Sequence, residues 1–599
     1  MENKKQALIL SGVAIVALLA LIIGATYAYF RASGNSGSNT DINVTTYTLD
    51  LLSFEMGSDI KINADQTSFA SGKGNATGST FAKAILTANN KTNTATKNYY
   101  MYLNISNNTF TYTQNENTPE LLLTITDVSG NAITSITGLT YKTVIDGKGT
   151  SVSGFDITTK SGLLTLFDNR EITASPIKTE EWNVTVTFVN YNVNQTGNAG
   201  KSFNAKLMIQ QEEYELTLAD ICAGKTLSDC VISQYTGTQG DNALYYHNST
   251  LTNGAGDNSY RYAGGDYVLT EAGKATGATM MIGYNNSVTT ALIDFYCNGT
   301  KQYVGYASSC STSHYYLIKG DTTQYQTYNE ALNASVEKGY LTKDNVKNFV
   351  CFGSDATTCP TENLYRIIGV FNNHVKLIKY DYAKSSLLGT DGDFSQEYTS
   401  NYYSGEQGES PSSNSLYYWN KSTGKNTWSE SNLNKINLNT NFVNNIGTIW
   451  AKKIATTTWK VGGGTYANLR DAVPKTAYQY EVGSSASTTT YDAKIGLMYV
   501  SDYYYSASPS AWTLVGYNSD YTKSYASAKG ENWLYGGGWD WTISRNSVNS
   551  DIAFFVDYFG YVYSDDVDSC SGVRPSFSLL SSTTYVSGSG SMSDPVRIN

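Results

Sequence analysis

Short runs in which apolar and polar residues alternate dominate the first third of the chain. The alternation is clearest over residues 184–188 and 202–209, and residues 101–105 and 121–125 repeat it. A period of two is typical of a strand with one buried face. Clusters of Asn, Gly, Ser and Thr separate the runs, which favours antiparallel connections. We therefore predict an all-β sandwich over residues 31–214.

Closer to the C-terminus, the period of two that is typical of strands occurs together with the spacing of three to four residues that is typical of helices. Alternating apolar residues flank Asn372-Asn373, which predicts a hairpin with a two-residue turn. Apolar residues near helical spacing predict a helix over 433–446, and alternation over 493–500 predicts a strand with Ile495, Leu497 and Tyr499 on one face. A mixed α+β domain is therefore expected over 361–599.

Residues 215–360 have a weaker pattern. Leu332 and Val336 lie four apart within 329–338, and Gly339 follows, which predicts a short helix with a glycine cap. The remainder is rich in Gly, Asn and Tyr. We interpret this region as a cysteine-containing connector or insertion and assign it no chemistry.

The N-terminus has the pattern of an export signal. Lys4 and Lys5 precede a weakly polar to apolar run over residues 7–24, and Thr26 and Ala28 offer small residues for cleavage. Residues 1–30 are either a cleaved signal peptide or a retained membrane anchor. A buried core helix is disfavoured because the run is not amphipathic. The preceding positive charge predicts that the rest of the chain lies outside the cell.

Cysteine spacing agrees with an oxidising exterior. Six of the seven cysteines form close pairs, which predicts three short disulfide loops: Cys222 with Cys230, Cys297 with Cys310, and Cys351 with Cys359. Cys570 is left over. No C-x-x-C occurs and the chain has only 3 His, so no metal site is expected.

Composition narrows the function classes. The 599 residues carry 41 Lys and Arg against 51 Asp and Glu, a net charge of −10, which argues against nucleic-acid binding. The 49 tyrosines outnumber the basic residues, so the surface is expected to be rich in tyrosine and uncharged polar groups. No Gly-x-Ser-x-Gly, His-Glu-x-x-His or Walker-type motif is present. We therefore predict neither an enzyme nor a cofactor.

The N-terminal third resembles a family of exported fibre proteins. The motifs that carry the resemblance are Tyr27-Ala28-Tyr29-Phe30, Tyr47-Thr48-Leu49-Asp50-Leu51, Trp182-Asn183-Val184-Thr185-Val186 and Asn198-Ala199-Gly200-Lys201. Together they resemble the TasA/camelysin family of biofilm-fibre proteins. The resemblance implies a jelly-roll-like sandwich processed by a dedicated signal peptidase, and some members polymerise by strand exchange.

The C-terminal region resembles a different fold group over residues 350–599. The order of its motifs is Trp539–Arg545, Ala553–Val556, Gly560–Val562 and Gly572–Phe577. It is similar to the C-type-lectin-like fold of the formylglycine-generating-enzyme group, found in surface proteins of gut bacteria. Enzymes of that group use two cysteines near this end, and here only Cys570 lies beyond Cys359. Glu-Pro-Asn and Gln-Pro-Asp, the calcium-binding loops of sugar-binding lectins, do not occur, so calcium-dependent binding is not expected.

A stretch near the C-terminus has a restricted composition. From Asn549 to Gly572, every residue belongs to the set reachable from an AAC or AAT codon by changing its adenines. Diversity-generating retroelements randomise adenines in this way, commonly in C-type-lectin-like targets. The alternative is that these loops are simply rich in such residues.

The residues of this stretch that are expected to be variable and to lie at the surface are the candidate ligand-binding residues. They are Asp557, Tyr558, Phe559, Tyr561, Tyr563, Ser564, Asp565, Asp566, Asp568, Ser569 and Cys570. Tyrosine offers a large contact area with few torsions to fix, as in antibody paratopes. Residues 503–505, all tyrosine, and Trp512 extend the predicted surface. Structural roles are expected for Trp541, Arg545, Gly572, Arg574 and Phe577.

These observations predict a cell-surface adhesin or receptor of a Gram-positive-type bacterium, secreted or held at the outer face of the membrane by its N-terminal segment. Its C-terminal domain is expected to bind an extracellular protein or glycan. The alternative is a structural biofilm-matrix or pilus-like subunit that assembles through the N-terminal sandwich. An enzyme of the formylglycine-generating kind ranks third.

Overall fold

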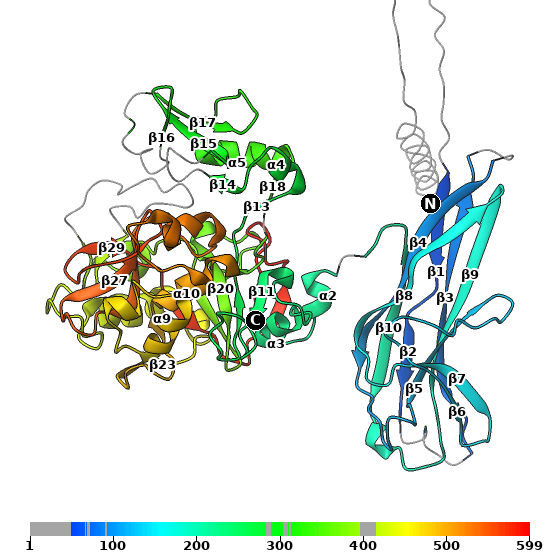
Figure 1. Cartoon of the computed structure of the whole chain (residues 1–599). Helices are drawn as coiled ribbons and strands as arrows, with labels where there is room; N and C mark the ends of the chain where they lie inside the picture. The colour runs from blue at the N-terminus through cyan, green and yellow to red at the C-terminus, as the bar shows by residue number, and fades with distance from the viewer. Residues whose placement is uncertain are drawn as a thin grey trace, which may run out of the picture. The chain divides into compact units, whose positions relative to one another are not determined.

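The computed structural model describes part of the chain in detail. The described residues are 50–65, 68, 72–89, 93–214, 216–282, 289–302, 310, 313–343, 345–395 and 415–599. The predicted leader over 1–30 lies outside them. Within the described residues no helix is both long and apolar enough to cross a membrane. The chain divides into two compact units, residues 1–216 and 217–599 (Figure 1).

The first unit is built from two antiparallel sheets. The six-stranded sheet has the order β1 (Leu51–Met56), β3 (Ala76–Thr87), β9 (Ile177–Phe188), β5 (Leu121–Asp127), β7 (Ser151–Asp156), β6 (Tyr141–Ile145). The four-stranded sheet has the order β2 (Ile60–Asn63), β10 (Ser202–Gln210), β4 (Ala95–Asn108), β8 (Gly162–Ala174). A 3-10 helix at Thr196–Asn198 precedes β10.

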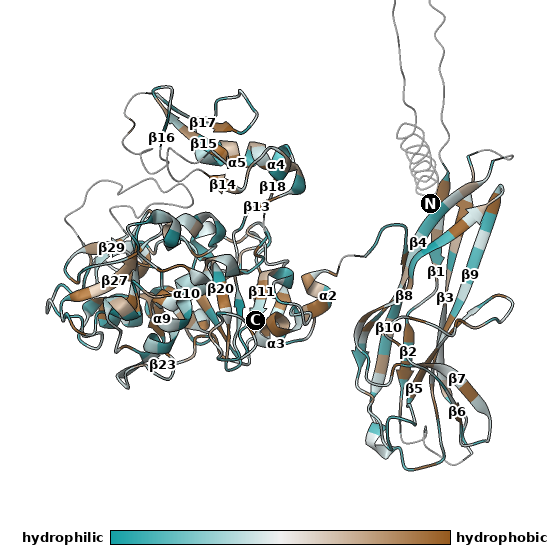
Figure 2. Cartoon of the chain, in the orientation of Figure 1, coloured by the Kyte–Doolittle hydropathy of each residue, from teal (hydrophilic) through white to brown (hydrophobic). Residues whose placement is uncertain are grey.

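The alternation seen in the sequence matches the burial of these strands. In β9, Val184 and Val186 are buried, and hydrophobic and hydrophilic segments alternate along the strand in Figure 2. In β10, Phe203, Ala205 and Leu207 are buried between more exposed neighbours. Side chains of both sheets join one hydrophobic core. The predicted β-sandwich is therefore confirmed.

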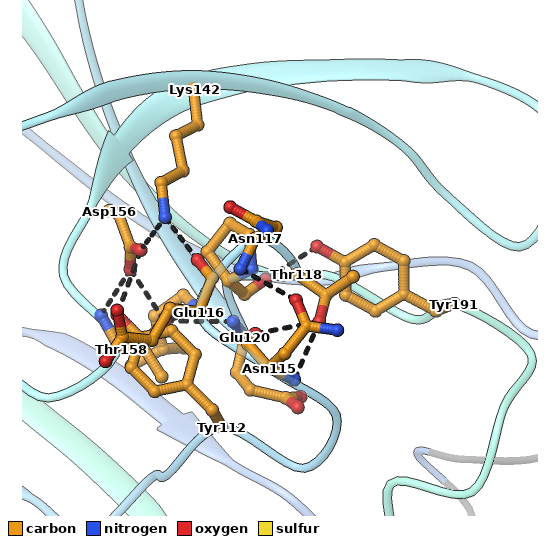
Figure 3. A network of polar contacts seen from close by, with 12 residues as sticks. Tyr112, Asn115, Glu116, Asn117, Thr118, Glu120, Lys142, Asp156, Thr158 and Tyr191 are labelled. Atoms are coloured by element: carbon orange, nitrogen blue, oxygen red, sulfur yellow. Dashed lines mark hydrogen bonds and ion pairs between the residues drawn. The ribbon is translucent and has the colours of Figure 1, made fainter.

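A polar network fixes the loop that follows β4 against the end of β7 (Figure 3). The carboxylate of Asp156 accepts hydrogen bonds from Lys142 Nζ at 2.8 Å, Tyr112 Oη at 3.0 Å and Thr158 Oγ1 at 2.8 Å. Burial opposes ionisation, yet the hydrogen bonds from Lys142 and Thr158 hold the pKa of Asp156 below its usual value. The carboxylate therefore remains an acceptor at neutral pH.

The second unit contains a seven-stranded sheet and a five-stranded sheet. The seven-stranded sheet has the order β11 (Leu244–Tyr246), β12 (Tyr260–Tyr262), β20 (Leu364–Phe371), β21 (His374–Lys379), β30 (Ser576–Ser578), β25 (Ile495–Gly496), with β19 (Phe349–Cys351) beside β20. The five-stranded sheet has the order β22 (Leu416–Tyr418), β29 (Cys570–Gly572), β26 (Asp540–Arg545), β27 (Ile552–Val556), β28 (Val562–Asp566). Two further pairs are β23 (Thr457–Lys460) with β24 (Thr490–Ala493), and β31 (Tyr585–Ser587) with β32 (Arg597–Ile598).

Helices of the second unit are short. The α-helices outside the insertion are α2 (Leu218–Cys222), α3 (Leu227–Ser233), α6 (Ser385–Leu388), α7 (Val443–Asn445), α8 (Thr448–Ala451), α9 (Pro474–Glu481) and α10 (Val500–Tyr505). A π-helix spans Leu433–Phe442 and runs into α7, so the predicted helix at 433–446 is confirmed with wider turns. Short 3-10 helices lie at Asp241–Ala243, Thr361–Asn363, Tyr466–Asn468, Pro509–Thr513, Tyr521–Lys523 and Tyr525–Glu531.

The hairpin predicted around Asn372-Asn373 is confirmed as β20 and β21. Phe371 pairs with His374, which leaves a two-residue turn. Both asparagines have positive φ, 48° and 63°, as a type I′ turn requires. By contrast, the strand predicted at 493–500 is wrong beyond β25. Residues 495–500 are all buried, so the alternation of residue types there does not correspond to one buried and one exposed face. After β25 the chain enters α10 at Val500.

The middle of the predicted connector forms a small insertion with its own core. Its elements are β13 (Val268–Leu269), α4 (Glu271–Ala275), β14 (Met280–Ile282), β15 (Ala291–Cys297), β16 (Thr300–Gln302), β17 (His314–Ile318), α5 (Tyr328–Glu337) and β18 (Leu341–Thr342). α5 is the short helix predicted from the sequence. Thr327 and Glu330 form its capping box, and Gly339 follows with a φ of 72°.

The two ends of the predicted connector belong to the main body of the second unit. The first end contributes β11 and β12, and the other contributes β19, all to the seven-stranded sheet. Side chains of Cys222, Leu227 and Val350 join the same core as Phe577. Region 215–360 thus divides between the sheet and the insertion. Its strands have only two to seven residues, which explains why their period is weak in the sequence.

All three predicted disulfides are present. Sγ–Sγ distances are 2.04 Å for Cys222–Cys230, 1.98 Å for Cys297–Cys310 and 2.01 Å for Cys351–Cys359. The first and third tie segments of the main body, and the second lies in the insertion. Such loops are typical of proteins that fold in an oxidising compartment.

Candidate ligand-binding face

The predicted binding residues lie on and after the hairpin formed by β27 and β28. Val556 pairs with Val562, and residues 557–561 form the connecting loop. Of the eleven predicted residues, all except Cys570 are exposed or half-buried. Tyr563 has an exposed fraction of 40%. The hairpin therefore presents most of the predicted set to solvent.

Asp557 holds the shape of this loop. Its Oδ1 accepts hydrogen bonds from the backbone N–H groups of Phe559 and Tyr561, both at 2.9 Å. Gly560 has a φ of 88°, and a Cβ there would lie 2.8 Å from Lys529 Cβ, so only glycine fits. Tyr503 Oη donates to the Gly560 carbonyl at 2.9 Å. The loop is thus fixed from both sides before any ligand binds.

Six aromatic rings form a continuous surface around this loop, which we call the aromatic face. Its members are Tyr517, Trp539, Tyr558, Phe559, Tyr561 and Tyr563. Successive ring centroids lie 6.4 Å apart for Trp539–Tyr558, 3.9 Å for Tyr558–Phe559, 6.3 Å for Phe559–Tyr561, 5.3 Å for Tyr561–Tyr517 and 5.3 Å for Tyr517–Tyr563. All six rings are half-buried or exposed, so they hold one another in place while keeping surface for contact.

The far end of the hairpin is acidic. Asp565, Asp566 and Asp568 lie there with Asp551, and Ser564 and Ser569 are half-buried beside them. Partial loss of hydration, together with the three neighbouring carboxylates, raises the pKa of Asp566. This edge gives the hairpin a negative potential.

The predicted extension of the face through Tyr503, Tyr504, Tyr505 and Trp512 is wrong. All four side chains are buried. The hydroxyls of the three tyrosines donate to backbone carbonyls, Tyr503 to Gly560 at 2.9 Å, Tyr504 to Leu469 at 2.7 Å and Tyr505 to Asn253 at 3.1 Å. Tyr503 therefore supports the hairpin loop from inside, while Tyr504 and Tyr505 tie α10 to other segments of the unit.

Cys570 is also misplaced in the predicted surface. It is buried in β29, opposite Tyr418 of β22, and packs with Leu416. The short strand pair covers its side chain, so its Sγ is not part of the aromatic face.

The residues predicted to be structural lie inward. Trp541, Gly572, Arg574 and Phe577 are buried and Arg545 is half-buried. Trp541 Nε1 donates to the Tyr417 carbonyl at 2.9 Å, which joins β26 to β22.

No protein-family model matches this chain, and no curated protein matches it. The function must therefore be inferred from the residues of the site.

Sequence reasoning missed Tyr517, the ring that joins Tyr561 to Tyr563. The Arg470 guanidinium lies 5.4 Å from the Tyr517 ring and 5.8 Å from the Tyr563 ring, and it is paired with Asp471 at 2.8 Å. Residues 470 and 517 are separated from the hairpin by tens of residues, and neither has a local motif. Only the tertiary structure brings them together.

Among the described residues, the face has no cluster of metal-ligating side chains. Over the part of the chain that the structure describes, no group of three or more His, Cys, Asp and Glu side chains is arranged to hold a metal ion. The face instead combines aromatic surface with hydroxyl and carboxylate groups.

We expect Asp557→Asn to change how stability depends on pH. Burial raises the pKa of Asp557 to about 7, against about 3.9 for an unfolded chain. Between these values the folded protein keeps a proton that the unfolded chain has lost, so wild-type stability decreases as pH rises from about 4 to 7. The amide keeps the Oδ1 acceptor without the charge. The pKa difference corresponds to ~4 kcal/mol at most, and solvent screening of this half-buried group lowers it. The variant should therefore gain ~1–2 kcal/mol at pH 8 relative to wild type and show no gain below about pH 4.

Urea unfolding at several pH values measures this difference. Asp568→Asn, which removes an exposed carboxylate just after the hairpin, controls for the change in net charge. If both variants changed the pH profile equally, net charge rather than the environment of the Asp557 carboxyl would be the cause.

Proposed function

We propose that this protein is an exported cell-surface adhesin or receptor, and that its aromatic face binds an extracellular protein or glycan. The observation that carries the proposal is the chain of six adjoining rings, four on the hairpin and two, Tyr517 and Trp539, beside it, around a loop that is fixed by Asp557 and Tyr503. Tyrosine-rich surfaces on rigid frames bind with a low loss of conformational entropy. The three disulfides support folding outside the cytoplasm.

The acidic edge favours a ligand with basic groups nearby. Asp565, Asp566 and Asp568 are exposed or half-buried at one end of the face. Charges at the rim of an interface mainly accelerate association and select against partners of the same sign. A protein with Lys or Arg beside an apolar patch fits this arrangement.

The proposal includes the finer fold relationships. A C-type-lectin-like arrangement over 361–599 is supported by the five-stranded sheet, whose strands all lie in this range, and by the hairpin that carries most of the candidate residues. A TasA/camelysin-like arrangement over 31–214 is supported by the ten-stranded antiparallel sandwich. Diversification of 557–570 by a retroelement is supported by the exposure of most of these residues. Cys570 is the exception among the eleven candidate residues, and Gly560, Val562 and Val567 within the same range are also buried. A reverse transcriptase gene nearby, with a near-copy of this coding stretch that differs at adenines, is the decisive observation.

The test of the face is loss of binding without loss of folding. The full exported chain is screened on arrays of glycans and extracellular proteins, and the best ligand is titrated by surface plasmon resonance. Replacing Tyr558, Tyr561 and Tyr563 together with alanine should weaken binding more than about tenfold, because aromatic anchors dominate interface energies. The melting temperature should fall by less than about 4 °C for a unit of this size.

Two further variants make the outcome clear. Tyr563→Ala removes the most exposed ring alone and should weaken binding with no thermal shift. Tyr480→Ala, an exposed tyrosine of α9 outside the face, should bind like wild type. Unaltered binding by the triple variant would disprove the proposed role of the face.

A further inference from the structure

A second site lies in the same unit, away from the hairpin. A cavity of about 420 Å³ is lined by residues of β12, β21, β23, α9 and α10 together with the turns beside them. This volume is within the range of ~300–1,000 Å³ that is typical of small-molecule sites. Asn372 and Thr458 at its rim are exposed. No residue of the aromatic face lines this cavity, so a ligand of the cavity would bind at a site distinct from the face.

Two ion pairs form the polar part of the cavity. Arg261 Nη2 lies 2.6 Å from Asp257 Oδ2, and Lys376 Nζ lies 2.5 Å from Asp502 Oδ2. Arg261 Nε also donates to Ser259 Oγ at 2.8 Å. Buried charge pairs are a poor source of stability, since desolvation offsets most of their attraction. Two such pairs in one cavity therefore suggest a role beyond stability.

Aromatic rings form the other walls. The Lys376 ammonium lies 4.7 Å from the Tyr499 ring and 5.3 Å from the Trp459 ring. Tyr478 of α9 is half-buried beside Arg261, with its ring 5.3 Å from the guanidinium. Trp459 Nε1 donates to the Ala493 carbonyl and Tyr499 Oη accepts from the Lys460 backbone N–H, so both rings are held in place.

The charged groups keep hydrogen-bonding capacity that the protein does not use. Over the described residues, Lys376 Nζ has one hydrogen-bond acceptor, Asp502, although an ammonium has three N–H donors. No protein donor is recorded on Asp502 Oδ1, since both of its recorded hydrogen bonds are to Oδ2. The side chains of Lys376 and Asp502 keep exposed fractions of 9% and 4%. Asp257, whose oxygens already accept from Ser259 and Arg261, keeps 16%. A ligand can therefore reach both a donor and an acceptor.

This pattern selects an uncharged ligand with several hydroxyls. A hydroxyl donates and accepts at once, so adjacent hydroxyls can donate to the carboxylates while accepting from Lys376. An anion would also face Asp257 and Asp502, and a cation would face Arg261, Lys376 and Lys460. We infer that this cavity binds a neutral saccharide unit of about hexose size, with its C–H face against Tyr478 and its hydroxyls on Asp257 and the Lys376–Asp502 pair.

Saturation-transfer NMR and calorimetry on the full chain test this inference. The probes are D-glucose, D-galactose, D-mannose and N-acetyl-D-glucosamine, with D-glucuronate and D-glucosamine as charged counterparts. At least one neutral sugar should bind with a millimolar Kd and more tightly than either charged sugar. Tyr478→Ala should weaken this binding at least about fivefold, since it removes the aromatic wall. Tyr480→Ala, two residues along the same helix, should not change it.

A measurement on the wild type keeps the inference testable if Tyr478→Ala does not fold. Hydrogen–deuterium exchange with saturating sugar should slow exchange in 457–460 and 499–502 and leave 557–566 unchanged. Failure of every neutral sugar to bind, tighter binding of a charged one, or protection confined to 557–566 would each overturn it. None of these results affects the triple-alanine test of the aromatic face.

Discussion

Replacing Arg574 with methionine should lower the free energy of unfolding of the second unit by ~3–5 kcal/mol, the range seen when one partner of a buried ion pair is removed. Arg574 and Asp540 are both buried. Arg574 Nε donates to Asp540 Oδ2 at 2.5 Å, and Nη2 donates to the Leu534 carbonyl at 2.7 Å. Methionine fills most of the volume but leaves the carboxylate and the carbonyl without donors.

The loss should grow with pH. Burial already raises the pKa of Asp540, although Arg574 opposes the shift. Without Arg574 the folded-state pKa must rise further. The folded variant then keeps a proton that the unfolded chain has lost above about pH 4. Its stability therefore decreases as pH rises, and the deficit relative to wild type should be larger at pH 8 than at pH 5 in urea unfolding.

Arg545→Met is the matched control, because Arg545 lies on β26, the strand that also carries Asp540, the partner of Arg574. Arg545 is half-buried, and its recorded hydrogen bonds are to neutral groups, the Val461 carbonyl at 3.0 Å and Asn426 Oδ1 at 3.2 Å. Its replacement exposes no unpaired charge, so we expect a smaller loss of ~1–2 kcal/mol without the added pH dependence. Equal losses with equal pH profiles in the two variants would show that Arg574 acts by packing alone.

The predictions that the structure confirms depend on local signals. Alternation over residues 184–188 identified β9 because that strand has one buried face. Asn372-Asn373 identified a type I′ turn because both positions need positive φ. The disulfides followed from short cysteine spacing, and α5 from its glycine stop. In each case the decisive residues are neighbours in the sequence.

Predictions fail where burial comes from distant segments. Tyr503, Tyr504 and Tyr505 look like a surface cluster in the sequence, but α10 is buried, and carbonyls far along the chain accept from their hydroxyls. Tyr517 is the opposite case, a surface residue that the sequence did not predict. Nothing nearby distinguishes it, yet it joins two rings of the aromatic face. Tyrosine suits both settings, so composition alone cannot tell which one applies.

Replacing Trp182 with alanine should destabilise the first unit by ~3–5 kcal/mol, the usual range for a buried aromatic residue. Trp182 is buried in the sandwich, with its ring centroid 4.7 Å from that of Phe167 and 4.6 Å from the Arg170 guanidinium. Its Nε1 donates to Tyr99 Oη at 2.9 Å, and Tyr99 in turn donates to Glu180 at 2.7 Å. The substitution therefore removes packing and one donor of a buried network.

Calorimetry of the full chain shows which of the two units the Trp182→Ala substitution destabilises. The two units have separate hydrophobic cores, so we expect a transition from residues 1–216 that shifts to lower temperature and a second that does not. Trp182→Phe keeps a ring against Phe167 but loses the hydrogen bond to Tyr99. Its free energy of unfolding should fall by only ~1–2 kcal/mol, mainly because Tyr99 Oη has one hydrogen-bond partner fewer. An equal shift of both transitions would mean that the units unfold as one. In that case ligand binding at the aromatic face would also depend on the sandwich, and the Trp182→Ala protein would lose binding at the temperature at which its sandwich unfolds.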